Sequence, residues 1–200
     1  MIDPVKFYFD FSSPYSYFAM LKIEETCNAV GREVVWKPFL LGVLFKITDT
    51  QPANHPAIKQ VYRENDWHQM ARFMDVSWNL PDPFPIPTQA PARAFYWIHD
   101  SNPILAKDFA RHVFEAYFSS SEDISSPDIV LKIATGLGID RAQLADALVG
   151  EDIKQRLKDE TQSAIESGVC GSPYFVVDGQ GFWGSDRIWM VRKWIERGGW

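Results

Sequence analysis

The residues best placed to do chemistry lie in segment 7–19, FYFDFSSPYSYFA, where an alternating aromatic run meets Ser12, Ser13 and Pro14. Ser13 can cap a helix by accepting a backbone N–H, and Pro14 suits the first helical position because it lacks a donor. Locally, an ordinary strand-to-helix connection is therefore favoured. The alternative is a catalytic junction, because a helix N-terminus stabilises anions. A second segment, Gly-Ser-Pro at 171–173, bears on this choice.

The two cysteines do not form a recognisable reactive pair. Cys27 and Cys170 make no C-x-x-C motif and no metal-type cluster, so neither a dithiol redox site nor a zinc site is supported. A structural disulfide between them stays open, but a reduced intracellular compartment is the better expectation. The histidines also show no metal-ligand spacing, and each is expected to be surface or core: His55, His68, His99 and His112.

Composition indicates a single large domain that buries its core without disulfides. The chain has 200 residues and a net charge of −6, without blocks of one sign, which argues against nucleic-acid binding. There is no basic segment followed by an apolar one at the start, and no stretch approaches 18 apolar residues. We expect a soluble, cytoplasmic protein that does not enter a membrane.

The elements that must position Ser13 begin with a strand-helix-strand unit. Segment 5–11 alternates with period two, placing Val5, Phe7, Phe9 and Phe11 on one face and Lys6, Tyr8 and Asp10 on the other. A helix is expected from about residue 15, ending near Gly31, and a second strand over 32–38. Such a unit implies two parallel strands with a right-handed crossover.

The middle of the chain is expected to be a helical insertion. We predict a loop over 40–55, a helix over 59–74 and a rigid loop over 78–91, which contains five prolines. Further helices are predicted over 92–98, 104–118, 127–136 and 141–149, the last of them capped by Asp140.

The C-terminal part returns to an α/β pattern. We predict a helix over 151–167, a strand over 174–177, a tight turn at 178–179, a short antiparallel strand over 181–183 and a final helix over 187–197. The whole order is that of an α/β, thioredoxin-like fold with a helical insertion between its βαβ and αββα halves. The corresponding division is 1–40 and 151–200 for the thioredoxin-like domain and 41–150 for the insertion. In this fold Ser13 and Pro173 would be neighbours.

Three groups of residues resemble the 2-hydroxychromene-2-carboxylate isomerase family, which is related to kappa-class glutathione transferases. They are F-x-F-D-F-S-S-P-Y-S-Y at 7–17, a middle group, and G-S-P-Y-F-V-V-D-G-x-x-F-W-G-S-D-R at 171–187. The middle group consists of Asn54, Lys59, Tyr62, Asn65 and Asp66. Their joint spacing is more specific than any one of them.

The resemblance implies a glutathione cofactor whose sulfur lies against Ser13, in the place of a redox cysteine. A hydroxyl donor at a helix N-terminus can hydrogen-bond a thiolate, and the helix dipole favours the charged form. Pro173 would be cis, which leaves the Ser172 backbone free to pair with the extended glutathione.

The resemblance also assigns the two ends of glutathione. Ser185 and Asp186 match positions that hold the γ-glutamyl end, where Asp186 can balance the ammonium group; without the family they would equally suit a plain helix cap. Asn54 and Lys59 match positions that bind glutathione from the insertion, although an exposed lysine is usually only solvated.

The leading hypothesis is a glutathione-dependent isomerase that interconverts 2-hydroxychromene-2-carboxylate and trans-o-hydroxybenzylidenepyruvate, or a similar small aromatic carboxylate. The Trp- and Pro-rich part of the insertion would form the apolar wall of the pocket, and relatives suggest a homodimer. Two alternatives stay open: a kappa-like glutathione transferase or peroxidase, and a non-catalytic thioredoxin-like binding protein.

Overall fold

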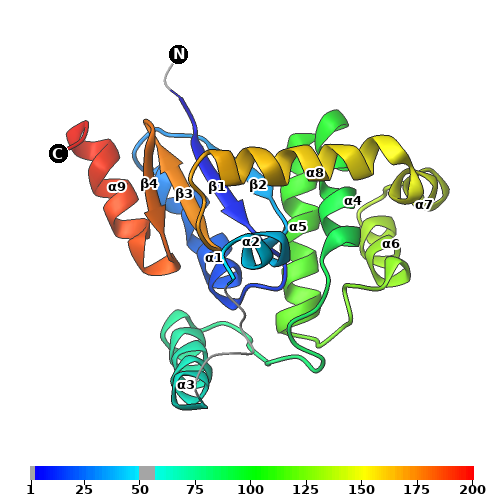
Figure 1. Ribbon diagram of the computed structural model, residues 1–200, viewed down its shortest axis with the longest axis horizontal. Helices are drawn as coiled ribbons and strands as arrows, with labels where there is room; N and C mark the ends of the chain where they lie inside the picture. The colour runs from blue at the N-terminus through cyan, green and yellow to red at the C-terminus, as the bar shows by residue number, and fades with distance from the viewer. Residues whose placement is uncertain (1–2, 50–56) are drawn as a thin grey trace.

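The computed structural model centres on a four-stranded sheet with the order β2-β1-β3-β4 (Figure 1). The first two strands run parallel, which confirms the predicted crossover unit, and the later hairpin is antiparallel to β1. β1 is therefore a central strand, as its aromatic and β-branched composition indicates. The strands are β1 (Val5–Phe9), β2 (Val34–Pro38), β3 (Tyr174–Val177) and β4 (Gln180–Trp183).

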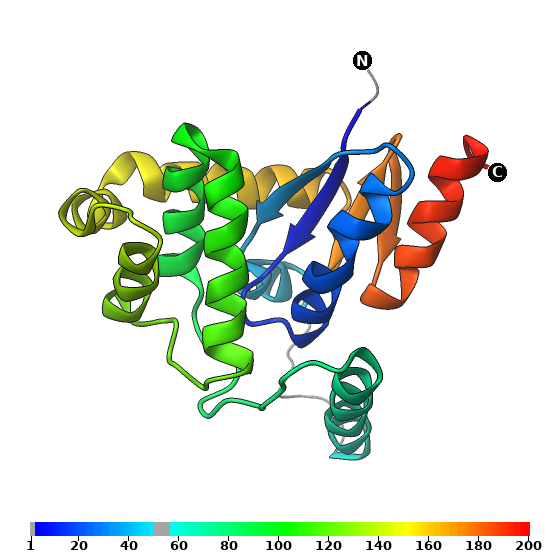
Figure 2. The same cartoon turned by 180° about the vertical axis from the view of Figure 1, so that it is seen from behind.

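Helices cover both faces of this sheet in the part of the chain that the structure describes, residues 3–49 and 57–200. Helix α8 crosses one face in Figure 1, and α1 lies on the other in Figure 2. The helices are α1 (Pro14–Asn28), α2 (Leu41–Ile47), α3 (Ala57–Met74), α4 (Gln89–Ser101), α5 (Pro103–Phe118), α6 (Pro127–Gly136), α7 (Arg141–Val149), α8 (Glu151–Glu166) and α9 (Ile188–Arg197).

Burial on both faces corrects the expected polar face of β1. Phe7 and Phe9 are fully buried in the larger core with α1, α4, α5 and α9, as predicted. Tyr8, expected on the polar face, is also buried, in a smaller cluster with Leu44 of α2 and Ala164 of α8. Asp10, just after the strand, is buried as well. Both faces of β1 are therefore packed against other elements, and neither face is exposed to solvent.

Most predicted elements are confirmed with small shifts in their ends. The predicted bounds of α6, α7 and β3 agree with the observed ones. The tight turn after β3 has positive φ at both Asp178 (49°) and Gly179 (79°), the geometry of a two-residue hairpin. Together these features establish the α/β thioredoxin-like fold with helices between its two halves; the exact domain division stays a prediction.

Two predicted elements differ from the structure. The predicted loop over 40–55 is wrong in its first part, because α2 occupies Leu41–Ile47. The final helix begins later than predicted, since a 3-10 turn, η2 (Ser185–Arg187), precedes α9. Within α9, Val191 is fully buried, whereas Trp194 is only partly buried.

Helix α3 stands at the N-terminal end of α1, below the main body in Figure 2. The segment that follows it, 75–88, contains no helix or strand, as its prolines predict, and leads into α4. This places the insertion beside the residues that follow β1. No helix within residues 3–49 and 57–200 has the length and apolar character that a membrane span requires.

Candidate functional site

Three segments that are distant in the sequence meet at one edge of the sheet. Tyr8, near the end of β1, pairs with Tyr174 at the start of β3, and Tyr174 pairs with Trp183 at the end of β4. The residues after β1, before β3 and after β4 must therefore lie together. These segments contain Ser13, Ser172 and Asp186, so the topology collects three of the predicted site residues.

Ser13 is the N-cap of α1, as predicted. Its Oγ accepts a hydrogen bond from the Ser16 N–H at 3.3 Å, and Pro14 occupies the first helical turn. The Ser13 hydroxyl donates to the Ser172 carbonyl oxygen at 3.1 Å. Ser13 is buried, with 5% of its surface exposed, at the N-terminus of α1.

Ser172 joins the cis-proline segment to both α1 and β1. Its Oγ accepts from the Asp10 N–H at 2.8 Å and shares a hydrogen bond of 2.7 Å with the Ser16 Oγ. The peptide between Ser172 and Pro173 is cis, as the family resemblance implies. Among the described residues, the Ser172 backbone N–H has no acceptor, so this edge is free to pair with an extended peptide.

Asp10 is a fully buried carboxylate beneath this site, and sequence reasoning missed it. It accepts hydrogen bonds from the Ser12 N–H at 2.8 Å, the Leu41 N–H at 2.8 Å and the Thr88 hydroxyl at 3.1 Å. Burial raises the pKa of Asp10, and these hydrogen bonds oppose that shift. The carboxylate thus ties the turn before α1 to the starts of α2 and α4. The sequence feature that could have identified Asp10 is an acidic residue within an apolar strand pattern.

The turn after β4 places Asp186 at the same edge with an exposed carboxylate. The Gly184 N–H donates to the Pro173 carbonyl at 3.0 Å, which fixes the turn against the cis-proline segment. Asp186 Oδ2 lies 3.1 Å from Arg187 Nη1, and its side chain is 70% exposed. Ser185 lies in η2 and does not cap α9 with its side chain, so the predicted capping role is wrong.

The predicted residues of the insertion are not brought into this contact. Asn54 lies outside the described residues. Lys59 is exposed on α3 and makes no hydrogen bond or ion pair with Ser13, Ser172 or Asp186. About two helical turns separate Lys59 from Asp66, the residue through which α3 contacts α1.

Helix α3 and the proline-rich segment form an aromatic wall beside the start of α1. The Tyr15 hydroxyl donates to Asp66 Oδ2 at 2.7 Å, and the rings of Tyr15 and Trp67 are 6.1 Å apart. Trp67 also contacts Phe84, at 5.7 Å, and Trp78, at 6.0 Å. Since Tyr15 is two residues from Ser13, this wall borders the candidate site.

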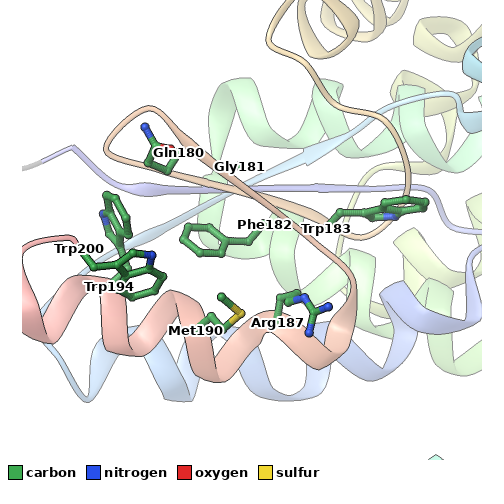
Figure 3. Close-up of a pocket in the computed structure, with 8 residues that line it drawn as sticks. All are labelled: Gln180, Gly181, Phe182, Trp183, Arg187, Met190, Trp194 and Trp200. Carbon is green, nitrogen blue, oxygen red and sulfur yellow. The ribbon is translucent and has the colours of Figure 1, made fainter.

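Trp183 covers the segment before Ser172. Its indole lies so close to the Gly171 backbone that a side chain at position 171 would overlap it. Trp183 also marks one end of an open groove of about 270 Å³ between β4 and α9, with Phe182 and Arg187 among its lining residues (Figure 3). That groove contains neither Ser13 nor Ser172 and lies outside the candidate site.

Both cysteines are free, so the structural disulfide is excluded. Cys27 is buried in α1, where burial raises the pKa of its thiol to about 12, while Cys170 is exposed beside Gly171. In residues 3–49 and 57–200 there is no group of three acidic, histidine or cysteine side chains able to hold a metal ion.

The described residues suit a peptide thiol such as glutathione. Ser13 provides a hydroxyl at a helix N-terminus, Ser172 provides an unpaired backbone N–H, and Asp186 provides an exposed carboxylate. These groups match a thiolate, an extended peptide backbone and an ammonium group, respectively. They would hold the sulfur, the cysteinyl backbone and the γ-glutamyl end.

Comparisons with known proteins find relatives that match nearly the whole chain. The chain is 25% identical over 205 residues to a protein named glutathione S-transferase kappa 2 from Caenorhabditis elegans, covering 96% of this chain and 91% of that one. It is 24% identical over 191 residues to a 2-hydroxychromene-2-carboxylate isomerase from Pseudomonas putida, covering 94% and 92%.

The structural comparison extends over the whole fold. A solved structure of a 2-hydroxychromene-2-carboxylate isomerase superposes with a TM-score of 0.86 at 22% identity, covering 98% of this chain and 95% of that one. The sequence model of the family described as DSBA-like thioredoxin domain matches residues 4–196. The chain therefore belongs to the family of DSBA-like thioredoxin domains, with isomerases and kappa-class transferases among its relatives.

Proposed function

We propose that this protein is a glutathione-dependent isomerase acting on 2-hydroxychromene-2-carboxylate or a similar small aromatic carboxylate. The observation that carries the proposal is the Ser13 hydroxyl at the N-terminus of α1, 3.1 Å from the carbonyl of Ser172, which precedes a cis proline. Because Ser13 cannot form a disulfide and neither cysteine lies beside it in the sequence, this position favours stabilising a thiolate over exchanging a disulfide.

When bound, glutathione supplies a thiolate nucleophile. The Ser13 hydroxyl would donate a hydrogen bond to that thiolate in place of the one it donates to the Ser172 carbonyl, and the α1 N-terminus favours the negative charge. The carbonyl and N–H of Ser172 then pair with the peptide backbone of the ligand. Asp186 balances the γ-glutamyl ammonium group, with Ser185 beside it, and Lys59 and Asn54 bind from the insertion.

The aromatic wall formed by Tyr15, Trp67 and Phe84 suits the ring of the second substrate. These rings lie beside the start of α1, where the bound sulfur is proposed to be. Stacked and edge-on aromatic contacts would orient the ring while leaving its conjugated chain toward Ser13. The proline-rich segment limits the motion of this wall because each proline fixes its own φ.

Two measurements test the proposal together. Calorimetric titration of the purified protein is expected to show glutathione binding, and an ultraviolet assay is expected to show interconversion of the chromene and the open pyruvate. Glutathione should be required in catalytic amounts and recovered unchanged. A protein that neither binds glutathione nor interconverts the two isomers contradicts the proposal.

A kappa-like glutathione transferase is the second candidate, favoured by the 25% identical relative of that name. It would share Ser13 and the glutathione groups, and differ in the fate of glutathione. Stoichiometric consumption of glutathione with a chlorinated aromatic acceptor, without isomerisation of the chromene, would favour the transferase. Glutathione binding that Asp186→Ala leaves unchanged, with neither activity, would favour a non-catalytic binding protein.

We also propose that the protein works as a cytoplasmic homodimer, on the basis of its resemblance to the family. Light scattering of the purified protein is expected to give twice the chain mass of 22.9 kDa. A monomeric mass at working concentration would contradict the dimer without bearing on the glutathione site.

A further inference from the structure

The face of α3 that contacts α1 also carries an arginine, Arg63. Residues three and four positions apart lie on the same side of a helix, so Arg63 shares its face with Asp66 and Trp67. Both of those residues contact Tyr15, through the hydrogen bond of 2.7 Å and the ring contact of 6.1 Å. Arg63 is therefore one turn along the face that borders the candidate site.

The charge of Arg63 acts on Tyr15 directly. Burial and the hydrogen bond to Asp66 raise the pKa of the Tyr15 hydroxyl well above its usual value, and Arg63 acts in the opposite direction. Arg63 therefore adds a positive charge on the side of α3 that contacts Tyr15, the residue two positions after Ser13.

The side chain of Arg63 is half-buried and, within the described part of the chain, has no hydrogen-bond or ion-pair partner. Its Nε is buried without an acceptor, and no carboxylate among residues 3–49 and 57–200 forms an ion pair with it. Two partly buried lysines are paired, Lys37 with Glu160 at 2.9 Å and Lys107 with Glu24. Arg93, whose Nε is also buried without an acceptor, donates from Nη1 to the Leu148 carbonyl at 3.4 Å. A half-buried guanidinium without an anion is costly, and an anionic ligand would offset that cost.

The neighbouring groups define the rest of such a ligand. Trp67 is 6% exposed, so neighbouring residues cover most of its ring, and its indole N–H is a buried donor without an acceptor. Phe84 and Tyr15 contact its ring. A planar aromatic molecule with a negatively charged, bidentate acceptor group matches this combination.

We propose that Arg63 binds the carboxylate of the aromatic substrate and thereby selects anionic over neutral substrates. This inference rests on the proposed function for its substrate class. Lys59 lies on the same face, one turn before Arg63, and family resemblance assigns it to glutathione. Lys59 would then bind the cofactor, and Arg63 would bind the substrate.

The test measures ligand binding without requiring turnover. The probes are 2-hydroxycinnamate, an aromatic carboxylate, and its neutral amide, titrated calorimetrically into wild type, Arg63→Gln and Arg63→Lys. Arg63→Gln is expected to weaken binding of the carboxylate at least about tenfold and leave the amide unchanged, because one charge-assisted bidentate pair is lost. Arg63→Lys, which keeps the charge, should recover part of that loss.

Arg72→Gln is the matched control. Arg72 is on the same helix, and nine residues at 100° each place it on the opposite face. It lines a separate groove with His68 and Trp78 and is expected to leave both probes unaffected. A loss in Arg72→Gln equal to that in Arg63→Gln would show a general charge effect and overturn the assignment.

The remaining outcomes separate this inference from the proposed function. Absence of measurable binding of 2-hydroxycinnamate to wild type, or equal loss of acid and amide in Arg63→Gln, overturns the role of Arg63. Arg63-dependent binding by a protein that does not bind glutathione supports Arg63 and contradicts the isomerase. Isomerase activity whose KM is unchanged by Arg63→Gln supports the isomerase and contradicts Arg63.

Discussion

The Ser13 hydroxyl donates its hydrogen bond to the Ser172 carbonyl over 3.1 Å, across 159 positions of sequence. The same Ser13 oxygen accepts the Ser16 N–H, and the Ser172 Oγ is bonded to both Ser16 and the Asp10 N–H. The two serines thus hold the start of α1 against the cis-proline segment. A ligand thiolate that accepts the Ser13 hydrogen bond would leave the Ser172 carbonyl free for the ligand backbone, which would link recognition of the sulfur to recognition of the peptide.

Ser13→Ala is expected to remove most of the activity while the protein stays folded. The loss of the N-cap costs about 1 kcal/mol of stability. Turnover should fall about a hundredfold, since one preorganised donor to a developing or full negative charge is removed. The ultraviolet absorbance of the bound glutathione thiolate, measured as a function of pH, should give a higher pKa for the bound thiol in Ser13→Ala than in wild type.

Ser12→Ala is the matched control for that change. Its Oγ accepts the Ile86 N–H at 3.1 Å, so the variant should lose a similar amount of stability and retain most activity. Equal losses of activity in the two variants would contradict the assignment of Ser13.

Asp186→Ala is expected to weaken glutathione binding about tenfold, because an exposed carboxylate that balances the ligand ammonium group is lost. Calorimetric titration measures the change. Arg187→Gln removes the ion-pair partner at 3.1 Å and should leave affinity unchanged or raised. If Arg187→Gln weakens binding as much as Asp186→Ala does, the turn binds the ligand in another way.

Asp10→Asn is expected to destabilise the fold by about 2 kcal/mol, because the amide offers one acceptor where the carboxylate serves the N–H groups of both Ser12 and Leu41. Urea unfolding measures the difference, and Asp159→Asn, on the exposed face of α8, is the control. A loss no larger than that of the control would contradict the linking role of Asp10.

The same variant tests a pH dependence. Burial raises the folded-state pKa of Asp10 above the unfolded value of 3.8. Its titration therefore contributes stability that is fully present below the unfolded pKa and is lost as the pH rises through the folded pKa. As the pH rises above the unfolded pKa, the stability difference between wild type and Asp10→Asn should shrink until the folded-state pKa is passed. A difference that grows would contradict the sign.

Iodoacetamide is expected to modify Cys170 and spare Cys27 in the folded protein. Cys170 is exposed, whereas burial raises the pKa of the Cys27 thiol to about 12 and leaves almost no thiolate at neutral pH. Mass spectrometry of the labelled peptides measures both sites. Unfolding in urea should make them equally reactive; equal labelling in the native state would contradict the burial of Cys27.

The sequence by itself determined the elements whose causes are local. Ser13 and Pro14 start α1, Asp140 caps α7 by accepting the Gln143 N–H at 2.9 Å, and Asp178 with Gly179 forms the hairpin turn. Each depends on residues a few positions apart, so pattern and side-chain chemistry suffice. The order of these elements also predicted the fold, and with it the approach of Ser13 to Pro173.

Only the tertiary structure decided the features whose partners are distant in sequence. Helix α2 has Leu40 at its N-cap without a side-chain bond, and its first N–H, from Leu41, is satisfied by Asp10, 31 positions earlier. The burial of Asp10, and the absence of an acceptor for the Arg63 Nε among the described residues, depend on which elements pack against them. Those contacts arise from the assembled layers, and no short-range pattern encodes them.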